Sequence, residues 1–406
     1  MMPKIFSTHS KVNLTMNRRD FLRLSALFTA AGSFPLLQAC ERKEAHNTTE
    51  KALKIGYLPI ADSAPLLVAH HQGLFAEAGI HVEKPVLFRN WASLVEAFFS
   101  GEVNVVHILS PMAVWARFSS RAPVKCVAWN HIDGSALTVA NNINNIKDLS
   151  GKTLAIPFWY SIHNILLQSL LTDAGLKATD KENPDENEVR LVVMPPSDML
   201  SALANNAISG YIVAEPFNAA AEIKQVGKIM RFTGDIWKHH ACCVVLMKEN
   251  DIKEHPQWTQ GVIDSLVKAQ IWIKNNRLET AHILSKNSPN AYTPHDETIL
   301  QKVFSPFDED LAHYLHNHSI SDGTKEWQRI DFQPYPFVSY YEELIARLKN
   351  TYLPNDTAFL SQLNPAQAAS DLVDDTFVRQ AIIQHNAQQL FDIPEDWTRK
   401  EEIVVK

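Results

Sequence analysis

Short apolar runs alternate with amphipathic stretches along the chain from about residue 54 onward. Runs such as residues 103–109 have apolar side chains at most positions, which is typical of a strand buried on both faces of a sheet. In the stretches between these runs, apolar residues recur three or four positions apart and predict helices. Strands and helices that alternate at this spacing indicate parallel βαβ units.

Two groups of such units follow one another in the sequence. The first is expected to have strands at residues 54–59, 82–88, 103–109, 124–129 and 136–139, with helices at 64–78, 91–99 and 112–118. The second is expected to have strands at residues 153–157, 189–194, 211–213 and 228–232, with helices that start at 162, 198 and 219. A strand at 242–247 should return to the first group, and the later chain predicts helices at 257–274, 278–286, 296–304, 339–349 and 374–389.

This order of elements indicates an α/β fold of two lobes, with the second lobe inserted into the first. Lobe 1 is predicted to comprise residues 53–140 and 241–350, and lobe 2 residues 141–240. A helical C-terminal extension follows at residues 351–406. A cleft between two such lobes commonly binds a small ligand and closes by a hinge.

The composition excludes several classes of protein. The chain has 406 residues, of which 46% are hydrophobic and 20% charged, so a globular protein is expected. Residues 1–39 hold five of the 38 basic and one of the 45 acidic residues, so the remainder carries 33 basic and 44 acidic residues and a formal charge of −11. We do not expect nucleic-acid binding, because it relies on Lys and Arg to neutralise phosphates. No GxGxxG or GxxxxGKS/T motif provides a nucleotide cradle.

The first forty residues have the features of an export signal. Arg18 and Arg19 precede an apolar stretch that is shorter than the roughly 20 residues of a membrane-spanning helix. The run RRDFL at residues 18–22 resembles the bacterial twin-arginine signal. The run LQAC at residues 37–40 resembles a lipobox, in which Cys40 becomes the lipidated first residue of the mature protein. The alternative is a plain signal cleaved near Ala39.

These features predict a signal peptide at residues 1–39 and a polar tether at residues 40–52. The diacylated Cys40 would supply enough acyl chain for stable membrane attachment. We therefore expect a protein that is lipid-anchored to the cell membrane, in the periplasm or at the cell surface.

Beyond Cys40 the chain has three cysteines, Cys126, Cys242 and Cys243. None forms a CxxC pair, so the zinc-ribbon and thioredoxin motifs are absent. Adjacent side chains on an extended strand point to opposite faces, so Cys242 and Cys243 are not expected to bridge each other. All three are interpreted as small buried apolar residues.

The remaining candidate chemistry is sparse. His313 and His316 could share a helix face, with His318 nearby, but no acid lies beside them at a spacing suited to metal binding. No GxSxG, HExxH or zinc-deaminase signature occurs, and no nucleophile and base can be paired. We therefore expect neither a metal site nor an enzyme.

An ordered set of short motifs runs along residues 53–345. The motifs are IGYLPI at 55–60, APL at 64–66, WA at 91–92, HILSPM at 107–112, MPP at 194–196, AEPF at 214–217, TGDIWK at 233–238 and DFQPYPF at 331–337. Together with the lipoprotein start, this set resembles the periplasmic solute-binding proteins of ABC importers. The similarity is greatest to the nitrate/bicarbonate branch of the nitrate/sulfonate/taurine family.

The resemblance implies a two-lobed, type II periplasmic-binding-protein fold of the Venus-flytrap kind. It also implies an extracytoplasmic component of an ABC importer that captures a small anion between its lobes: nitrate, bicarbonate or a small organic anion. The expected partners are an ABC permease and its ATPase.

The resemblance also assigns ligand-binding residues. The family's ligand tryptophan falls on Trp91, its cleft histidine on His163 and its anion-facing lysine on Lys238. Glu215 matches a position that helps hold calcium in the bicarbonate relatives, so the resemblance allows a calcium ion as cofactor. Ser135 stands where the nitrate binders have a glutamine, a departure that argues against nitrate.

Each assignment has a plainer alternative. Trp91 could instead be a core residue at the sheet end, His163 a solvent-facing histidine and Lys238 a surface lysine. The aromatic run at residues 158–160 could form a cleft wall for a flat organic ligand, or it could pack beneath its own loop.

Two other functions share the same fold. A sensory binding module would use the same residues but would dock on a membrane receptor. A pyrimidine-precursor synthase would need a cofactor lysine, a sacrificial histidine and a cysteine-rich motif, for which the pair Cys242 and Cys243 is thin support.

Overall fold

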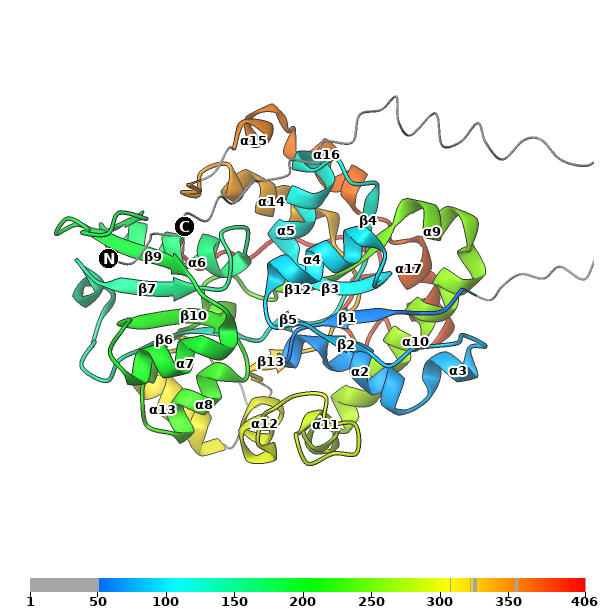
Figure 1. Ribbon diagram of the computed structural model, residues 1–406, viewed down its shortest axis with the longest axis horizontal. Coiled ribbons are helices and arrows are strands. Elements are labelled where there is room, and N and C mark those ends of the chain that lie inside the picture. Colours follow the sequence, from blue (N-terminus) through cyan, green and yellow to red (C-terminus); the bar gives the residue numbers. More distant parts are fainter. Residues whose placement is uncertain (1–50, 307, 322, 324–326, 355–356, 406) are drawn as a thin grey trace, which may run out of the picture. The chain divides into compact units, whose positions relative to one another are not determined.

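The computed structural model describes residues 51–306, 308–321, 323, 327–354 and 357–405. Residues 50–406 form one compact unit, which is described by itself (Figure 1). The predicted signal peptide, the lipidation site Cys40 and nearly all of the predicted tether lie outside the described residues.

The first lobe is built on a sheet with the strand order β2-β1-β3-β12-β4. The strands are β1 (Ile55–Tyr57), β2 (Val86–Leu87), β3 (Val105–Leu109), β4 (Val124–Trp129) and β12 (Cys243–Lys248). β1 pairs in parallel with β2 and β3, whereas β12 is antiparallel to both β3 and β4. The sequence therefore predicted correctly that residues 242–247 return to the first lobe.

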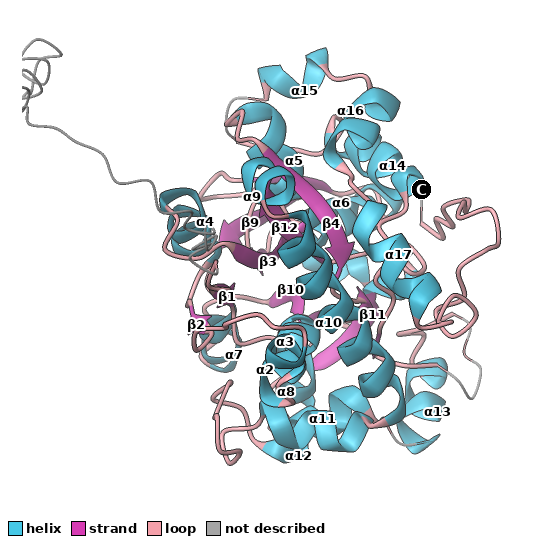
Figure 2. Cartoon of the chain, turned by 90° about the vertical axis from the view of Figure 1, so that its right-hand side faces the viewer, coloured by secondary structure: helices cyan, strands magenta, loops and turns pink. Residues whose placement is uncertain are grey.

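Helices enclose this sheet, as Figures 1 and 2 show. They are α2 (Ala64–His71), α3 (Leu74–Glu77), α4 (Trp91–Ser100), α5 (Ser110–Val114), α9 (Glu249–Glu254), α10 (Pro256–Asn275), α11 (Arg277–Leu284), α12 (Glu297–Phe304) and α14 (Val338–Leu348). Short helical turns add η1 (Ala61–Ser63) after β1 and the π-turn η2 (Trp115–Ser119) after α5. The helix predicted at residues 64–78 is divided in two by Gly73, whose φ of 73° lies in the left-handed region that glycine tolerates.

The second lobe is built on a sheet with the order β11-β6-β10-β7-β9-β8. Its strands are β6 (Ser135–Val139), β7 (Thr153–Ile156), β8 (Lys177–Thr179), β9 (Glu188–Val193), β10 (Gly210–Ala214) and β11 (Lys228–Phe232). Its helical elements are α6 (Ile162–Asp173), α7 (Pro196–Ala204), α8 (Phe217–Ile223), η3 (Ile146–Leu149) and η4 (Thr233–Asp235).

The lobe boundary differs from the prediction. β6 is antiparallel to both β10 and β11 and so belongs to the second sheet, although residues 136–139 were expected in lobe 1. The chain therefore crosses between the lobes before Ser135 rather than near Asn141. Both sheets are mixed rather than parallel, because β12 in the first sheet and β6 in the second are antiparallel to their neighbours.

Residues expected in lobe 1 also pack on lobe 2. Helix α13 (Asp308–His316) places Tyr314 against Phe232 of β11, with ring centroids 4.8 Å apart. A two-stranded sheet of β5 (Ile132–Asp133) and β13 (Ile330–Asp331) lies at the crossing. The segment after α12 thus runs across from one lobe to the other.

The C-terminal extension contains the helices α15 (Ala358–Gln362), α16 (Pro365–Leu372) and α17 (Thr376–Gln384). It touches lobe 1 where Val373 bridges Cys126 of β4. It approaches lobe 2 at Tyr352, whose N–H donates to Gln168 of α6 (2.8 Å). The extension therefore contacts both lobes.

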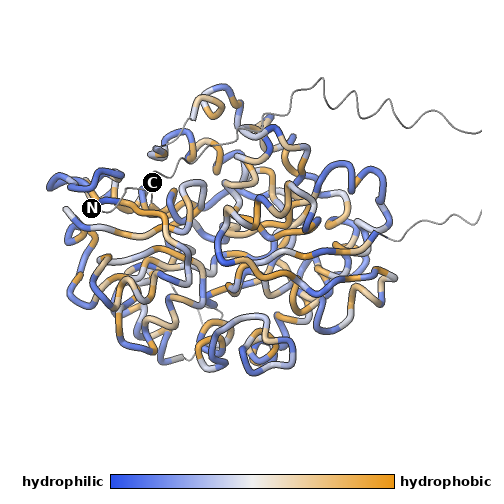
Figure 3. The backbone as a smooth tube through the Cα atoms, in the orientation of Figure 1, coloured by the Kyte–Doolittle hydropathy of each residue, from blue (hydrophilic) through white to orange (hydrophobic). Residues whose placement is uncertain are grey.

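Apolar residues concentrate in the strands of both sheets, where Figure 3 shows the most hydrophobic segments of the backbone tube. Strands β3, β6 and β10 are buried along their whole length. Among the described residues, none of the helices combines the length and the apolar character that crossing a bilayer requires.

Candidate functional site

Trp91 is the first residue of α4, and the side chain of Asn90 caps this helix by accepting the Ser93 N–H (2.9 Å). The Trp91 side chain is 2% exposed, as a core residue would be. Its indole N–H nevertheless has no hydrogen-bond partner among the described residues. Its ring meets that of His107 on β3, with centroids 5.6 Å apart. Burial alone would suit a core residue, but a buried indole N–H normally has an acceptor.

His163 and Ser135 meet in lobe 2. His163 lies in the first turn of α6, which begins after Ser161, and the Ser161 side chain accepts the Asn164 N–H (3.1 Å). His163 Nε2 lies 2.9 Å from the hydroxyl of Ser135, the first residue of β6. Both side chains are buried, so the solvent-facing alternative for His163 is wrong. Two of the predicted ligand residues are therefore brought together.

These residues belong to a larger group that we call the buried polar cluster. It comprises Asp62, Trp91, His107, Asn130, His131, Ser135, His163, Cys242 and Cys243. The two lobes touch within it, because His163 Nε2 lies 3.7 Å from Cys242 Sγ.

Several elements of lobe 1 contribute side chains to the cluster. Asp62 lies in the turn η1 after β1, and its Oδ2 is 2.8 Å from Nε2 of His131, which follows β4. Cys243 opens β12, and its N–H donates to the same His131 nitrogen (3.3 Å). His107 Nε2 accepts the N–H of Leu58 (2.8 Å). The ends of β1, β3 and β4 and the start of β12 thus meet at one edge of the first sheet.

The side chains of Cys242 and Cys243 were predicted to point to opposite faces of a strand, and this prediction is wrong. Their sulfur atoms lie 3.9 Å apart and both residues are free cysteines, so the side chains do not point to opposite faces. Cys242 precedes the first residue of β12, and the strand alternation therefore does not apply to it.

Burial and charge set the protonation of the cluster. Burial works against a charged His131, but the Asp62 carboxylate outweighs it and raises the pKa of His131 to about 10. Burial also raises the pKa of Asp62 to about 6, although His131 opposes this shift. For His107, burial lowers the pKa to about 3, and the charge of His131 adds to the effect. The Asp62 carboxylate thus favours the protonated form of His131, and burial favours the neutral form of His107.

Unpaired polar atoms are frequent in the cluster. Within the described residues, the buried atoms without a hydrogen-bond partner include Trp91 Nε1, Nδ1 of His107, His131 and His163, both side-chain atoms of Asn130 and both carboxylate oxygens of Asp62. A native protein leaves few such atoms unpaired, because each costs about 1–3 kcal/mol. Their concentration between two lobes is chemically suited to binding a small polar or charged solute.

Lys238 and Glu215 do not join the cluster. The Lys238 ammonium lies 2.7 Å from Glu402 at the edge of a separate cavity of about 740 Å³, which Ser135 also lines. Glu215 is fully buried, and its Oε1 accepts from Arg329 Nε (2.9 Å).

The surroundings of Glu215 do not suit calcium. Its Oε2 accepts the N–H of Ala219 (3.1 Å), and its Oε1 already faces the Arg329 guanidinium. Calcium takes six to eight oxygen ligands, whereas here a fixed cation occupies the place of a metal. The calcium that the resemblance allowed therefore does not fit at Glu215.

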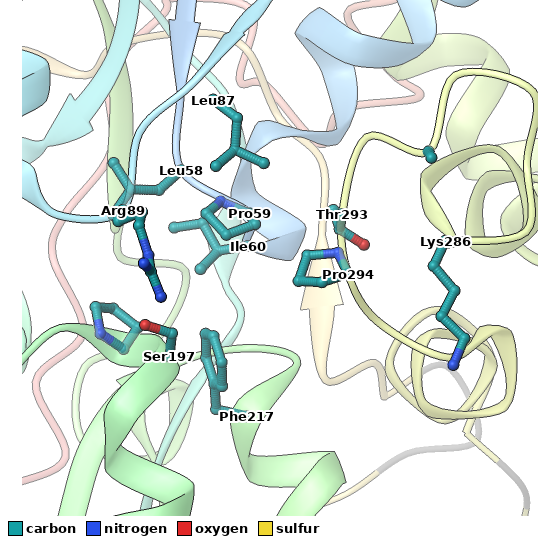
Figure 4. Close-up of a pocket in the computed structure, with 12 residues that line it drawn as sticks. Leu58, Pro59, Ile60, Leu87, Arg89, Ser197, Phe217, Lys286, Thr293 and Pro294 are labelled. Atoms are coloured by element: carbon teal, nitrogen blue, oxygen red, sulfur yellow. The ribbon is translucent and has the colours of Figure 1, made fainter.

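An open cavity of about 520 Å³ lies between the lobes, and none of the residues that line it belongs to the cluster. Its walls include Leu58, Ile60 and Leu87 from lobe 1 and Phe217 from lobe 2, so it is largely apolar. In Figure 4 the Arg89 side chain extends from lobe 1 toward Ser197, at the start of α7. The volume lies within the range usual for small-molecule pockets.

The aromatic run at residues 158–160 packs rather than lining this cavity. Trp159 meets Tyr352 edge-on and Tyr160 meets Phe359, each with ring centroids 6.1 Å apart. The packing alternative is therefore correct, although the partners come from the C-terminal region. His313 is exposed on α13 and contacts Asn317.

Comparisons with known proteins agree with this architecture. The nitrate-binding protein NrtA from Synechocystis, a solved structure, superposes with a TM-score of 0.68 at 19% identity, over 87% of this chain and 94% of that one. The "Nitrate/nitrite binding protein NrtA" of Nostoc sp. is 28% identical over 341 residues, 76% of this chain and 72% of the relative. The "Bicarbonate transport ATP-binding protein CmpC" of Synechocystis is 25% identical over 260 residues, 59% of this chain but only 38% of the relative.

These similarities establish an α/β periplasmic binding protein of type II with two mixed sheets and a helical C-terminal region, as the sequence predicted. A family model described as the NMT1-like family matches residues 46–286. The chain belongs to the NMT1-like family and is a solute-binding protein distantly related to the nitrate and bicarbonate binders of ABC importers.

Of the nine residues of the cluster, only Trp91, Ser135 and His163 were among the predicted ligand-binding residues. Asp62, His107, Asn130 and His131 were missed, because each lies in a largely apolar stretch of the sequence without a metal- or anion-binding motif. The pair Cys242 and Cys243 was visible, but its partners His163 and His131 are 79 and 112 residues away in the sequence.

Proposed function

We propose that this chain is the solute-binding component of an ABC importer and that it captures a small anion in the buried polar cluster. One observation carries the proposal. The cluster offers unpaired buried nitrogens from both lobes: Trp91 Nε1 and His107 Nδ1 from lobe 1, and His163 Nδ1 from lobe 2. A solute that accepts hydrogen bonds from both lobes would hold them together.

The chemistry of these groups favours an anion. Since Nε2 of His107 accepts the Leu58 N–H, its Nδ1 carries the proton and faces the interior as a donor. The indole N–H of Trp91 can only donate. Donors fixed in a buried site bind a negative charge strongly, because the solute exchanges mobile water for groups that are already oriented.

The candidate solutes are nitrate, bicarbonate and small organic anions. The relatives NrtA and CmpC bear names that refer to nitrate and bicarbonate, but the resemblance places Ser135 where the nitrate binders have a glutamine. The cavity of about 520 Å³ lies between the same two lobes, and its Arg89 and apolar walls suit the body of an organic anion. The proposed partners are an ABC permease and its ATPase, with a lipid anchor at Cys40.

Native mass spectrometry of the purified full chain tests the proposal, together with thermal unfolding in nitrate, bicarbonate, a short alkanesulfonate or chloride. A solute that binds only the folded protein stabilises it by about 2.7 kcal/mol at 100 times its Kd. We expect one anion to raise the melting temperature well above the chloride control. If no anion in a broad panel does so and nothing co-purifies, the proposal is wrong.

A further inference from the structure

Four residues of the buried polar cluster have a second property in common. Each of Asp62, His131, Cys242 and Cys243 offers a side-chain atom that can ligate a metal, and the four atoms lie within 4.8 Å of one another. All four side chains are fully buried, and all come from the first-lobe edge of the cluster. We propose that these four residues bind one zinc ion.

Two of the six ligand–ligand separations are close to those of a tetrahedral site. Two sulfur atoms at the usual ~2.3 Å from zinc lie ~3.8 Å apart, and Cys242 Sγ and Cys243 Sγ are separated by 3.9 Å. A nitrogen and an oxygen at ~2.0 Å from zinc lie ~3.3 Å apart. His131 Nε2 and Asp62 Oδ2 are separated by 2.8 Å, so they need to open by only about half an ångström.

The ligand types select the ion. Two thiolates favour zinc, copper(I) or iron–sulfur clusters over calcium and magnesium, which prefer oxygen ligands. The imidazole and the carboxylate suit zinc better than copper(I), which is the softer ion. Four protein ligands complete a tetrahedron, as in structural zinc sites, which leave no position open for catalysis.

The carboxylate of Asp62 gives an independent reason to expect a cation. Neither of its oxygens has a hydrogen bond of good geometry, although the side chain is fully buried and His131 lies within ion-pair distance. A buried carboxylate normally has two or more hydrogen-bond donors or a metal as partner. A zinc ion between Asp62, His131 and the two sulfurs would satisfy it.

The inference does not depend on anion capture. A zinc ion here would join the ends of β1 and β4 to the start of β12 within lobe 1, and it would fix Cys242 beside His163. It would also protect the two thiolates from oxidation in the extracytoplasmic compartment that we propose for this chain.

Zinc uptake by the full chain tests the inference. Protein purified under reducing conditions and stripped with a chelator should bind one Zn²⁺ per chain in competition with a chromophoric chelator. X-ray absorption at the zinc edge should show two sulfur ligands at ~2.3 Å and two nitrogen or oxygen ligands at ~2.0 Å. Uptake far below one equivalent, or a zinc shell without sulfur, would overturn the inference.

Cysteine variants locate the site. Cys243→Ser should weaken zinc binding at least ~100-fold, because even the loss of an outer-shell partner costs 10–100-fold. Cys126→Ser is the matched control, since Cys126 is equally buried but contacts Tyr341 (2.8 Å) outside the cluster. Equal zinc affinity in the two variants would place the ion elsewhere.

If Cys243→Ser does not fold, the isosteric variant Asp62→Asn tests the site instead. With Co²⁺ in place of zinc, the wild-type chain should show thiolate-to-metal charge transfer and the visible bands of tetrahedral cobalt. Asp62→Asn should keep the charge transfer but shift the visible bands and weaken zinc binding. Unchanged bands and affinity would remove Asp62 from the site and contradict the proposal, as would a Cys242–Cys243 disulfide whose reduced form takes up no zinc.

Discussion

Buried nitrogen atoms without a hydrogen-bond partner distinguish Trp91 and His163 from most core residues. A core tryptophan of this burial normally donates its indole N–H to an oxygen acceptor. Trp237, for example, donates to the carboxylate of Glu401 (2.9 Å). Trp91 Nε1 and His163 Nδ1 instead have no hydrogen-bond partner among the described residues. Their side chains are therefore expected to contribute more to binding than to folding.

The first prediction concerns these donors. His163→Ala and Trp91→Phe should each weaken the binding of the captured anion roughly 10- to 150-fold, because a hydrogen bond to a charged group contributes about 1.5–3 kcal/mol. Isothermal titration calorimetry measures the change, with exposed His313→Ala as the control that should bind normally. Normal binding by both cluster variants would show that the anion lies elsewhere.

The second prediction concerns the ion pair of Glu215 and Arg329. Both side chains are fully buried, so removing one leaves an uncompensated charge in the interior. Arg329→Ala should lower the free energy of unfolding by about 3–5 kcal/mol, whereas Arg379→Ala, which breaks a partly exposed pair with Asp375, should cost about 0–1 kcal/mol. Urea denaturation compares the two. Similar losses would mean that burial does not control the strength of these pairs.

At the level of single residues, the sequence predicted Ser135, Trp91 and His163 in or beside the interlobe region but could not predict what Lys238 and Glu215 contact. The partner of Lys238 is Glu402 near the end of the chain, and that of Glu215 is Arg329, 114 residues later. Such pairs are fixed by the tertiary fold and leave no periodic signal in the sequence.

Among the elements, α4 has the most direct connection to the proposed site because it begins at Trp91. Asn90→Ala should remove the cap that accepts the Ser93 N–H and lower the free energy of unfolding by about 1 kcal/mol. Asn90→Ser keeps a capping oxygen and should lose much less. The comparison is made by urea denaturation, and equal losses would show that the cap does not stabilise α4.

The sequence predicted strands of the described sheets where apolar runs are long. It did not predict the order of the strands within each sheet. β3, β4 and β12 follow from their apolar patterns, and the return of β12 to lobe 1 follows from the interruption of the second group. The place of β6 beside β10 and β11 depends on pairings between residues more than 70 positions apart. β8, with three residues, is too short for a periodic signal.

For the whole molecule, the C-terminal extension matters because it contacts both lobes. Tyr352 bonds to α6 in lobe 2 through its N–H and through its hydroxyl to Asp180 (2.7 Å), while Val373 bridges β4 in lobe 1. A hinge between the lobes would have to carry this segment with it. The sequence predicted a helical extension with a helix at residues 374–389, but neither the two helices before it nor this bridging position.

The anchor gives a prediction for the protein in its cell. Cys40→Ser should move the chain from the membrane fraction to the soluble periplasm or leave it unprocessed, because the lipobox cysteine supplies the acyl chains. Fractionation with lipid labelling measures this. In a second variant, replacement of both Arg18 and Arg19 by Lys should block export, because the twin-arginine route requires this pair. Unlabelled protein that stays in the membrane fraction would exclude lipidation.

The central claim is that an anion binds in the buried polar cluster, and a crystal structure of the full chain with its captured solute tests it most directly. We predict an anion within hydrogen-bond distance, ~2.7–3.2 Å, of Trp91 Nε1 or His107 Nδ1 from lobe 1 and of His163 from lobe 2. A solute found only in the cavity beside Arg89, or only near Lys238, with no contact to these nitrogens, would contradict the account.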